Sequence, residues 1–274
     1  MRFRGVRGMT ALADDGLPGW GRVRRVAFFV WAVILSLLFG ITFVGVTVLT
    51  IGMWLVNQNP YTTPVTDLGF FALGAIIIAT GFVVQLRAPE HKIAGVQQAV
   101  IGLLALGVAG LIGGRVEPLT GSLLFLVATA MLVALHPARR EFFKVGTRLS
   151  PRLAALSILA AIPATTYATT MLIQARQAGP SCFFGRCAYG DRFAEMAALA
   201  ISIVIAGMLA ASKPGGWRVT AWSVGAAAAT LGSASIVLPE LPGALGQSGG
   251  AMTVAWGVLF IAVAEWEVRT WGVA

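Results

Sequence analysis

The two cysteines of this chain lie close together, as Cys182 and Cys187 in the segment Cys-Phe-Phe-Gly-Arg-Cys. Thiols at this spacing can form a disulfide, bind a metal or exchange electrons. No histidine lies near them, and two thiols alone make a weak zinc site. A disulfide across so short a loop would stabilise the fold by roughly 2 kcal/mol. We predict a structural disulfide, with free thiols as the first alternative and a metal or redox role as the second.

A second candidate site is a stripe of polar residues in an otherwise apolar segment. Thr166, Thr170 and Gln174 recur every four residues, so they share one face of a helix, and Tyr167 is adjacent. Glu195, in the next apolar segment, is expected to face the same region. We predict that these five residues line a small ligand-binding pocket beneath the cysteine loop. The alternative is that the threonines bond to their own helix and Glu195 is simply a charged group near an interface.

The remaining polar residues give weaker signals for chemistry. Gln85, Gln97 and Gln98 are typical of hydrogen bonds between helices, and His136 before a proline is interpreted as a helix-end cation or interfacial residue. The chain lacks HExxH, GxSxG and P-loop signatures. We therefore expect no metal site and no cofactor, and the lack of a catalytic motif favours a non-enzymatic role while leaving enzymatic activity open. Five carboxylates that fall on one side of the predicted membrane could still converge into a site: Asp67, Glu117, Asp191, Glu195 and Glu240.

Eight apolar runs must position these residues. Hydrophobic residues make up 57% of the chain and charged residues 11%, and a helix needs about 20 apolar residues to cross a bilayer. The pattern predicts an all-α, polytopic integral membrane helix bundle of about eight transmembrane helices within 26–268. A basic tail, 1–25, is predicted to be disordered, and 269–274 form a short second tail. The predicted spans are 26–56, 68–86, 93–114, 119–136, 153–175, 193–212, 219–238 and 250–266.

The positive charge indicates how the chain is oriented. Sixteen of the twenty Lys and Arg residues fall in segments on the side of the N-terminus, and four fall on the other side. Basic loops stay in the cytoplasm during insertion, so we predict a cell (plasma) membrane protein with both termini cytoplasmic and the cysteine loop extracytoplasmic. The same rule accounts for the formal charge of +9, so the partner is the lipid bilayer and not nucleic acid. Seventeen arginines against three lysines, with abundant Ala and Gly, favour a bacterial origin.

Function follows mainly from what the apolar runs lack. No charged residue lies near the middle of a run, which disfavours a proton-coupled pump. We expect a non-enzymatic sensor or partner subunit with an extracytoplasmic cysteine loop, acting with another membrane protein or as a homo-oligomer. The first alternative is a transporter or permease for a neutral or lipid-like solute, favoured by the helix kink expected at Pro163. The second is an interfacial lipid-modifying enzyme.

Overall fold

A computed structural model describes residues 18–57, 64–144, 146, 148–178 and 188–271. Within these residues the chain forms helices and no strands. Eight helical segments are long and apolar enough to cross a membrane. The α-helices are α1 (Pro18–Asn57), α2 (Pro64–Phe71), α3 (Thr80–Val83), α4 (Ile93–Gly113), α5 (Val116–Leu135), α6 (Pro151–Gln177), α7 (Ala188–Ala211), α8 (Trp217–Val237) and α9 (Gly246–Trp271).

The predicted all-α membrane bundle is confirmed, and each predicted span overlaps one of the eight helical segments. The first helix differs most from the prediction. It begins at Pro18, so residues 18–25, which we expected to belong to a disordered tail, form its first turns. Proline suits the first turn of a helix because its missing N–H would have no partner there. The cysteine loop with Cys182 and Cys187 lies outside the described residues.

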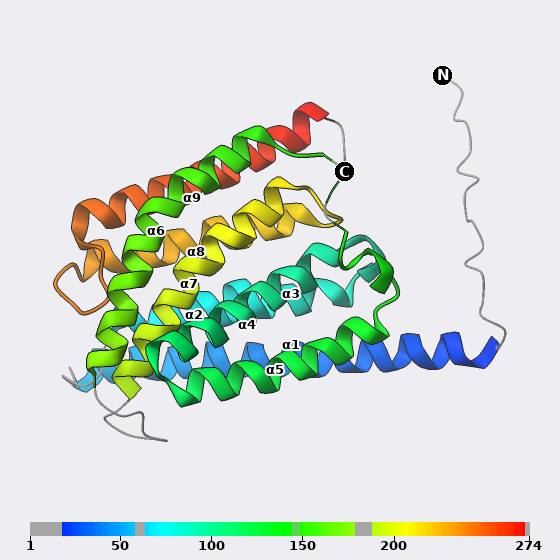
Figure 1. Cartoon of the computed structure of the whole chain (residues 1–274), viewed down its shortest axis with the longest axis horizontal. Coiled ribbons are helices and arrows are strands. Elements are labelled where there is room, and N and C mark those ends of the chain that lie inside the picture. The colour runs from blue at the N-terminus through cyan, green and yellow to red at the C-terminus, as the bar shows by residue number, and fades with distance from the viewer. Residues whose placement is uncertain (1–17, 58–63, 145, 147, 179–187, 272–274) are drawn as a thin grey trace.

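The helices lie side by side in an extended bundle, with α1 along one edge and α9 along the other (Figure 1). Helices α4, α7 and α8 occupy the middle and bury most of their side chains, whereas α5, α6 and α9 present apolar residues to the outside. Side chains such as Leu124, Val127 and Ile162 are therefore exposed although they are apolar. Such a surface suits hydrocarbon, where lipid tails take the place of water.

The connections divide the bundle into two ends. We call one the arginine-rich end; it holds the connections 87–92, 136–150 and 212–216 and lies to the right in Figure 1. The opposite, arginine-poor end holds the turn between α4 and α5 and the connection 238–245 between α8 and α9. The cavities and polar clusters of the protein lie at one of these two ends or among the helices between them.

The second span is less regular than the sequence predicts. Between α2 and α3, residues Ala72–Ala79 form a π-helix, in which the turn is wider by one residue. A side chain satisfies each of two backbone carbonyls of this segment. The Thr80 hydroxyl donates to the Ile76 oxygen, and Gln98 Nε2 on α4 donates to the Ile77 oxygen at 2.6 Å. Hydrocarbon offers no hydrogen-bond partners, so backbone carbonyls in a membrane must be bonded within the protein. The polar side chains next to this segment supply these bonds and so stabilise its geometry.

Helices α8 and α9 approach each other most closely through two pairs of glycines. A Cβ added to Gly225 would lie 2.6 Å from the Gly257 oxygen, and one added to Gly257 would lie 2.5 Å from the Gly225 oxygen. Gly232 and Gly250 are related in the same way, at 2.6 and 2.7 Å. Both pairs leave no room for a side chain. These glycines therefore let the two helix backbones approach closely within one chain, as small residues do in membrane helices.

Candidate functional site

The polar stripe on α6 lines a cavity at the arginine-poor end. This cavity, which we call the mouth, has a volume of about 730 Å³. It lies between the second half of α6 and the connection between α8 and α9, with Phe193 of α7 also contributing. Its lining residues are Pro163, Thr166, Tyr167, Thr170, Met171, Gln174, Phe193 and the run Glu240–Leu245.

Hydrogen bonds fix the walls of the mouth and leave one acceptor without a partner. The Tyr167 hydroxyl donates to the backbone oxygen of Gly243 at 2.6 Å, which ties α6 to the connecting loop. Gly243 has φ +85°, a left-handed conformation that favours glycine. The Thr170 hydroxyl donates to its own helix, at the Thr166 oxygen, and can still accept a bond. Gln174 also lines the mouth, and its buried Oε1 has no hydrogen-bond partner among the described residues.

Four of the five predicted ligand-binding residues come together in the mouth, and one does not. Thr166, Tyr167, Thr170 and Gln174 line it, but Glu195 points to a different cluster. The hydroxyls of Thr166 and Thr170 do bond to their own helix, as the alternative interpretation expects, and this does not prevent them from lining a cavity. We expected the cysteine loop to cover the pocket. That loop lies outside the described residues; within them, the connection between α8 and α9 forms one wall of the mouth.

Glu195 belongs to a buried cluster of charges at the start of α7. The Arg192 guanidinium lies 2.8 Å from Glu195 Oε2, three residues further along the same helix, and 3.1 Å from Asp67 Oδ1. Arg115 lies 4.0 Å from Asp191 and donates to the Ala175 backbone oxygen. Three of the five outer carboxylates thus converge, but each has an arginine beside it.

The pairing with arginine determines what this cluster can do. Buried ion pairs join helices and are costly to break, because each charge would lose its compensating partner. Among the described residues, no three of His, Cys, Asp and Glu gather so as to hold a metal ion. The arrangement ties α2, α6, α7 and the turn between α4 and α5 together beside the mouth, which makes it a scaffold for the site.

A second cavity, which we call the chamber, adjoins the mouth and was not predicted. It has a volume of about 600 Å³ and is lined almost entirely by apolar side chains. Helices α6 and α9 form its walls, and α7 and α8 form its floor through residues such as Ile203 and Leu231. Pro163, Tyr167 and Leu245 line both cavities. The only sequence signal was Pro163, because apolar residues that line a cavity have the same types as those that face lipid.

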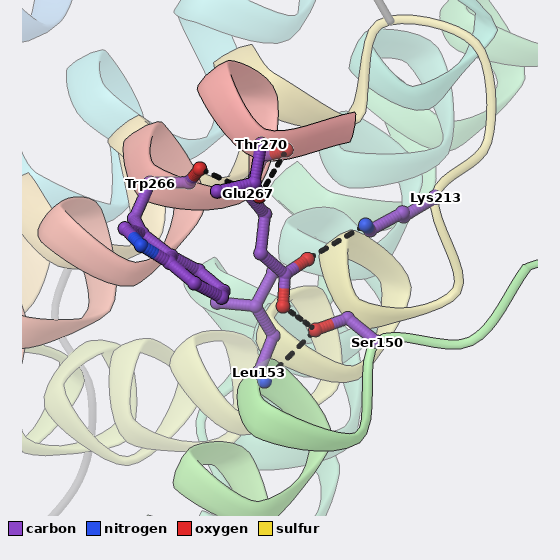
Figure 2. Close-up of polar contacts among 6 residues, drawn as sticks. All are labelled: Ser150, Leu153, Lys213, Trp266, Glu267 and Thr270. Carbon is purple, nitrogen blue, oxygen red and sulfur yellow. Dashed lines mark hydrogen bonds and ion pairs between the residues drawn. The ribbon is translucent and has the colours of Figure 1, made fainter. Parts of the chain in front are cut away.

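A buried polar cluster at the arginine-rich end holds the same two helices together (Figure 2). Glu267 of α9 is 2% exposed, and its carboxylate accepts a hydrogen bond from the Ser150 hydroxyl at 2.6 Å. Its other oxygen lies 2.6 Å from the Lys213 ammonium. Ser150 also caps α6, because its hydroxyl oxygen accepts a hydrogen bond from the Leu153 N–H. The cluster joins the beginning of α6, the end of α9 and the connection between α7 and α8.

Further contacts join α6 and α9 along the half of their length nearest this cluster. Trp256 Nε1 donates to the Leu156 backbone oxygen at 3.1 Å, and the Arg152 guanidinium lies 4.2 Å from the centre of the Trp266 ring. Beyond Trp256 the chamber lies between the two helices, and the bond from Tyr167 to Gly243 joins α6 to the connection that precedes α9. The helices therefore form a V that is fixed at the arginine-rich end and open toward the arginine-poor end.

The glutamines at the arginine-rich end link helices, as predicted, but His136 is not a cation. Its side chain is fully buried, and burial lowers the pKa of His136 to about 4, although Glu90 acts in the opposite direction. Nδ1 accepts from the Ala138 N–H at 3.0 Å, so the proton is on Nε2, which donates to Gln85 Oε1 at 3.1 Å. Gln85 Nε2 in turn donates to the Lys92 oxygen. The interpretation of His136 as a charged helix end was wrong because tertiary packing covers it.

The fold and the site define a class: an α-helical, multi-pass membrane protein with a two-part cavity between two of its outer helices. In comparisons with known proteins, no family model matches the chain, and no curated protein or solved structure matches it. The chemistry of the cavity is therefore the basis for a functional proposal.

Proposed function

We propose that this protein is a non-enzymatic membrane sensor whose mouth receives a small neutral ligand. The observation that carries the proposal is the mouth itself, a cavity of about 730 Å³ in which hydroxyls and the partnerless Oε1 of Gln174 stand among apolar groups. Ligand sites have this composition: mostly apolar walls with a few polar groups that fix orientation. Among the described residues that line the mouth there is no Lys or Arg, so a neutral ligand fits this lining better than an anion.

The contacts between α6 and α9 favour sensing over transport. A ligand in the mouth or the chamber meets a closed seam at Trp256, which is bonded to α6, and further contacts at Trp266 and Glu267. The two helices that surround the ligand are the ones joined at the opposite end by Glu267 and Ser150. A displacement in the mouth is thereby carried to the arginine-rich end, where a partner protein or a second copy could receive it.

Orientation and environment complete the proposal. The distribution of Lys and Arg supports a cell membrane location with the arginine-rich end and both termini in the cytoplasm. In a bacterial cell the mouth would then face the extracytoplasmic side, where a disulfide between Cys182 and Cys187 persists. The sensor would therefore sample molecules outside the cell or in the outer half of its membrane.

The experiment pairs a lining threonine with its neighbour. Thr170 lines the mouth, whereas Thr169 does not, and each donates its hydroxyl to the carbonyl one turn earlier. Native mass spectrometry of protein extracted in mild detergent should show a small-molecule adduct in the wild type and in Thr169→Val, and less of it in Thr170→Val. Removal of the adduct should change hydrogen exchange in 213–218 if the protein is a sensor. Equal adducts in both variants would remove the mouth as the binding site, and unchanged exchange would remove the sensing role.

A further inference from the structure

The mouth and the chamber adjoin at Pro163, Tyr167 and Leu245, and polarity changes from one cavity to the other. The mouth offers hydroxyls, an amide oxygen and the exposed carboxylate of Glu240, whereas the chamber offers almost only hydrocarbon. Tyr167 stands at the junction with its hydroxyl toward the loop and its ring on the chamber wall. A ligand that matches both parts must itself be amphipathic.

The chamber opens on the surface that faces lipid. Leu159, Ile162 and Met252 line it, and these side chains are 66%, 75% and 68% exposed. They come from α6 and α9, so the opening lies between those two helices, in the gap above the Trp256 contact. An alkyl chain can therefore enter sideways from the membrane without passing through water.

The length of the chamber along α6 is close to the hydrocarbon thickness of one leaflet. On α6 its lining runs from Tyr167 back to Leu159, eight residues, or about 12 Å at 1.5 Å per residue. The hydrocarbon of one leaflet is about 15 Å deep, half of about 30 Å. A tail that begins near Tyr167 and ends beside Trp256 would therefore have about the length that one leaflet holds.

The mouth determines which head group fits. Phosphate would lie near the Glu240 carboxylate, and within the described part of the chain no Lys or Arg lines the mouth to compensate its charge. Gln174 Oε1 and the hydroxyl oxygens need hydrogen-bond donors. Because the tail leaves one apolar environment for another, burying it supplies little net driving force, and these polar contacts must supply the selectivity.

We infer that the site binds a neutral lipid of the leaflet at the arginine-poor end, with a phosphate-free, hydroxyl-bearing head in the mouth and one alkyl tail in the chamber. This inference rests on the proposed function and adds the chemical class of its ligand. It also assigns a role to α9, whose residues from Leu245 to Trp256 contact the tail.

The test uses a monoalkylglycerol probe with a diazirine at the end of its tail. The full chain is placed in phosphatidylcholine nanodiscs that contain a small fraction of this probe, irradiated and digested, and the labelled residues are mapped by mass spectrometry. Label should appear on chamber residues near Trp256 and should be removed by unlabelled monoalkylglycerol, but not by an alkyl phosphate of equal length. Gln174→Leu should weaken competition about fivefold, the effect of one lost hydrogen bond. Gln177→Leu, an exposed position outside the lining, should not.

A steric variant tests the tail separately. Ala164 lines the chamber, so Ala164→Phe should fill it and reduce the chamber label about tenfold. Ala155→Phe adds the same volume on the exposed face of α6 and should leave the label unchanged. Equal thermal stability of the two variants would show that loss of label is not loss of fold.

The outcomes separate the inference from the proposal on which it rests. If Thr170→Val removes the native adduct but the probe never labels the chamber, the mouth binds a ligand without a tail, and this inference fails alone. If the probe labels exposed residues of α5 as strongly as the chamber, and Thr170→Val keeps its adduct, both fail. Equal competition by the alkyl phosphate would overturn the choice of head group.

Discussion

The buried carboxylate of Glu267 offers the sharpest test of how α6 and α9 are held together. Glu267→Gln keeps the size of the side chain and an oxygen that can accept from Ser150. It places an amide N–H₂, a donor, against the Lys213 ammonium, which is also a donor. The change therefore removes the compensating negative charge from a lysine side chain that is only 11% exposed.

The magnitude follows from comparison with a second ion pair on the same helix. Glu265 lies 2.6 Å from Arg218, the same distance as Glu267 from Lys213, but the Arg218 side chain is 54% exposed. At 2.6 Å the Coulomb attraction is about 6 kcal/mol for an effective dielectric constant of 20 and about 1.6 kcal/mol for that of water, before desolvation is subtracted. Breaking one side of a buried pair costs about 3–5 kcal/mol, and losing an exposed pair costs about 0–1 kcal/mol.

Reversible unfolding in mixed detergent micelles measures both effects. We expect Glu267→Gln to lower the free energy of unfolding by about 3 kcal/mol, and Glu265→Gln by less than about 1 kcal/mol. Lys213→Met combined with Glu267→Gln should be less destabilised than the sum of the single variants, because neither charge is then left alone. Equal effects of Glu267→Gln and Glu265→Gln, or simple additivity in the double variant, would refute the reasoning.

Three further predictions concern packing, protonation and topology. Gly232→Ala should lower the free energy of unfolding by about 1–3 kcal/mol, because its Cβ would lie 2.6 Å from the Gly250 oxygen. A Cβ at Gly121 would meet nothing within 4 Å, so in the same unfolding assay Gly121→Ala should be neutral or stabilising by about 0.5–1 kcal/mol. Burial lowers the pKa of His136 to about 4 in the folded protein from 6.5 in the unfolded chain, so between these pH values the unfolded chain binds one proton more than the folded protein. The stability should therefore be intact above pH 6.5 and decline as the pH falls toward 4. Thermal unfolding of His136→Gln should lack this component of the pH dependence. An impermeant maleimide added to intact cells should label Cys182 and Cys187 only after reduction; labelling without reductant would contradict the disulfide, and labelling only after lysis would contradict the orientation.

The sequence predicted the local features that depend on a single helix. The spacing of Thr166, Thr170 and Gln174 on one helix face holds whatever packs against that face, because helical periodicity alone sets it. The ion pair between Arg192 and Glu195 was likewise predictable, since residues three apart on a helix are neighbours. The bridging role of Gln85 and Gln98 followed from the cost of leaving an amide without partners in hydrocarbon.

Features that need several helices were not predictable. His136 is next to a proline at a helix end, which in sequence indicates an exposed cation, and only the packing of Phe28 and Gln85 around it shows that it is neutral. Glu195 was assigned to the pocket because its position along α7 was known but its facing direction was not. Arg192, which binds the Glu195 carboxylate outside the pocket, also pairs with Asp67, more than a hundred residues earlier in the chain.

The sequence by itself determined that the chain spans a membrane about eight times as an all-α bundle, because apolar length and the absence of midspan charge are properties of each segment alone. It also placed a polar stripe on α6. Only the tertiary structure decided that this stripe faces a cavity, that an apolar chamber continues it, and that α9 supplies the opposite wall. The physical reason is that lipid-facing, packed and cavity-lining positions draw on the same apolar residues. Helices α6 and α9 are joined at Glu267 and separate beyond Trp256. This arrangement depends on contacts between residues about a hundred positions apart in the chain.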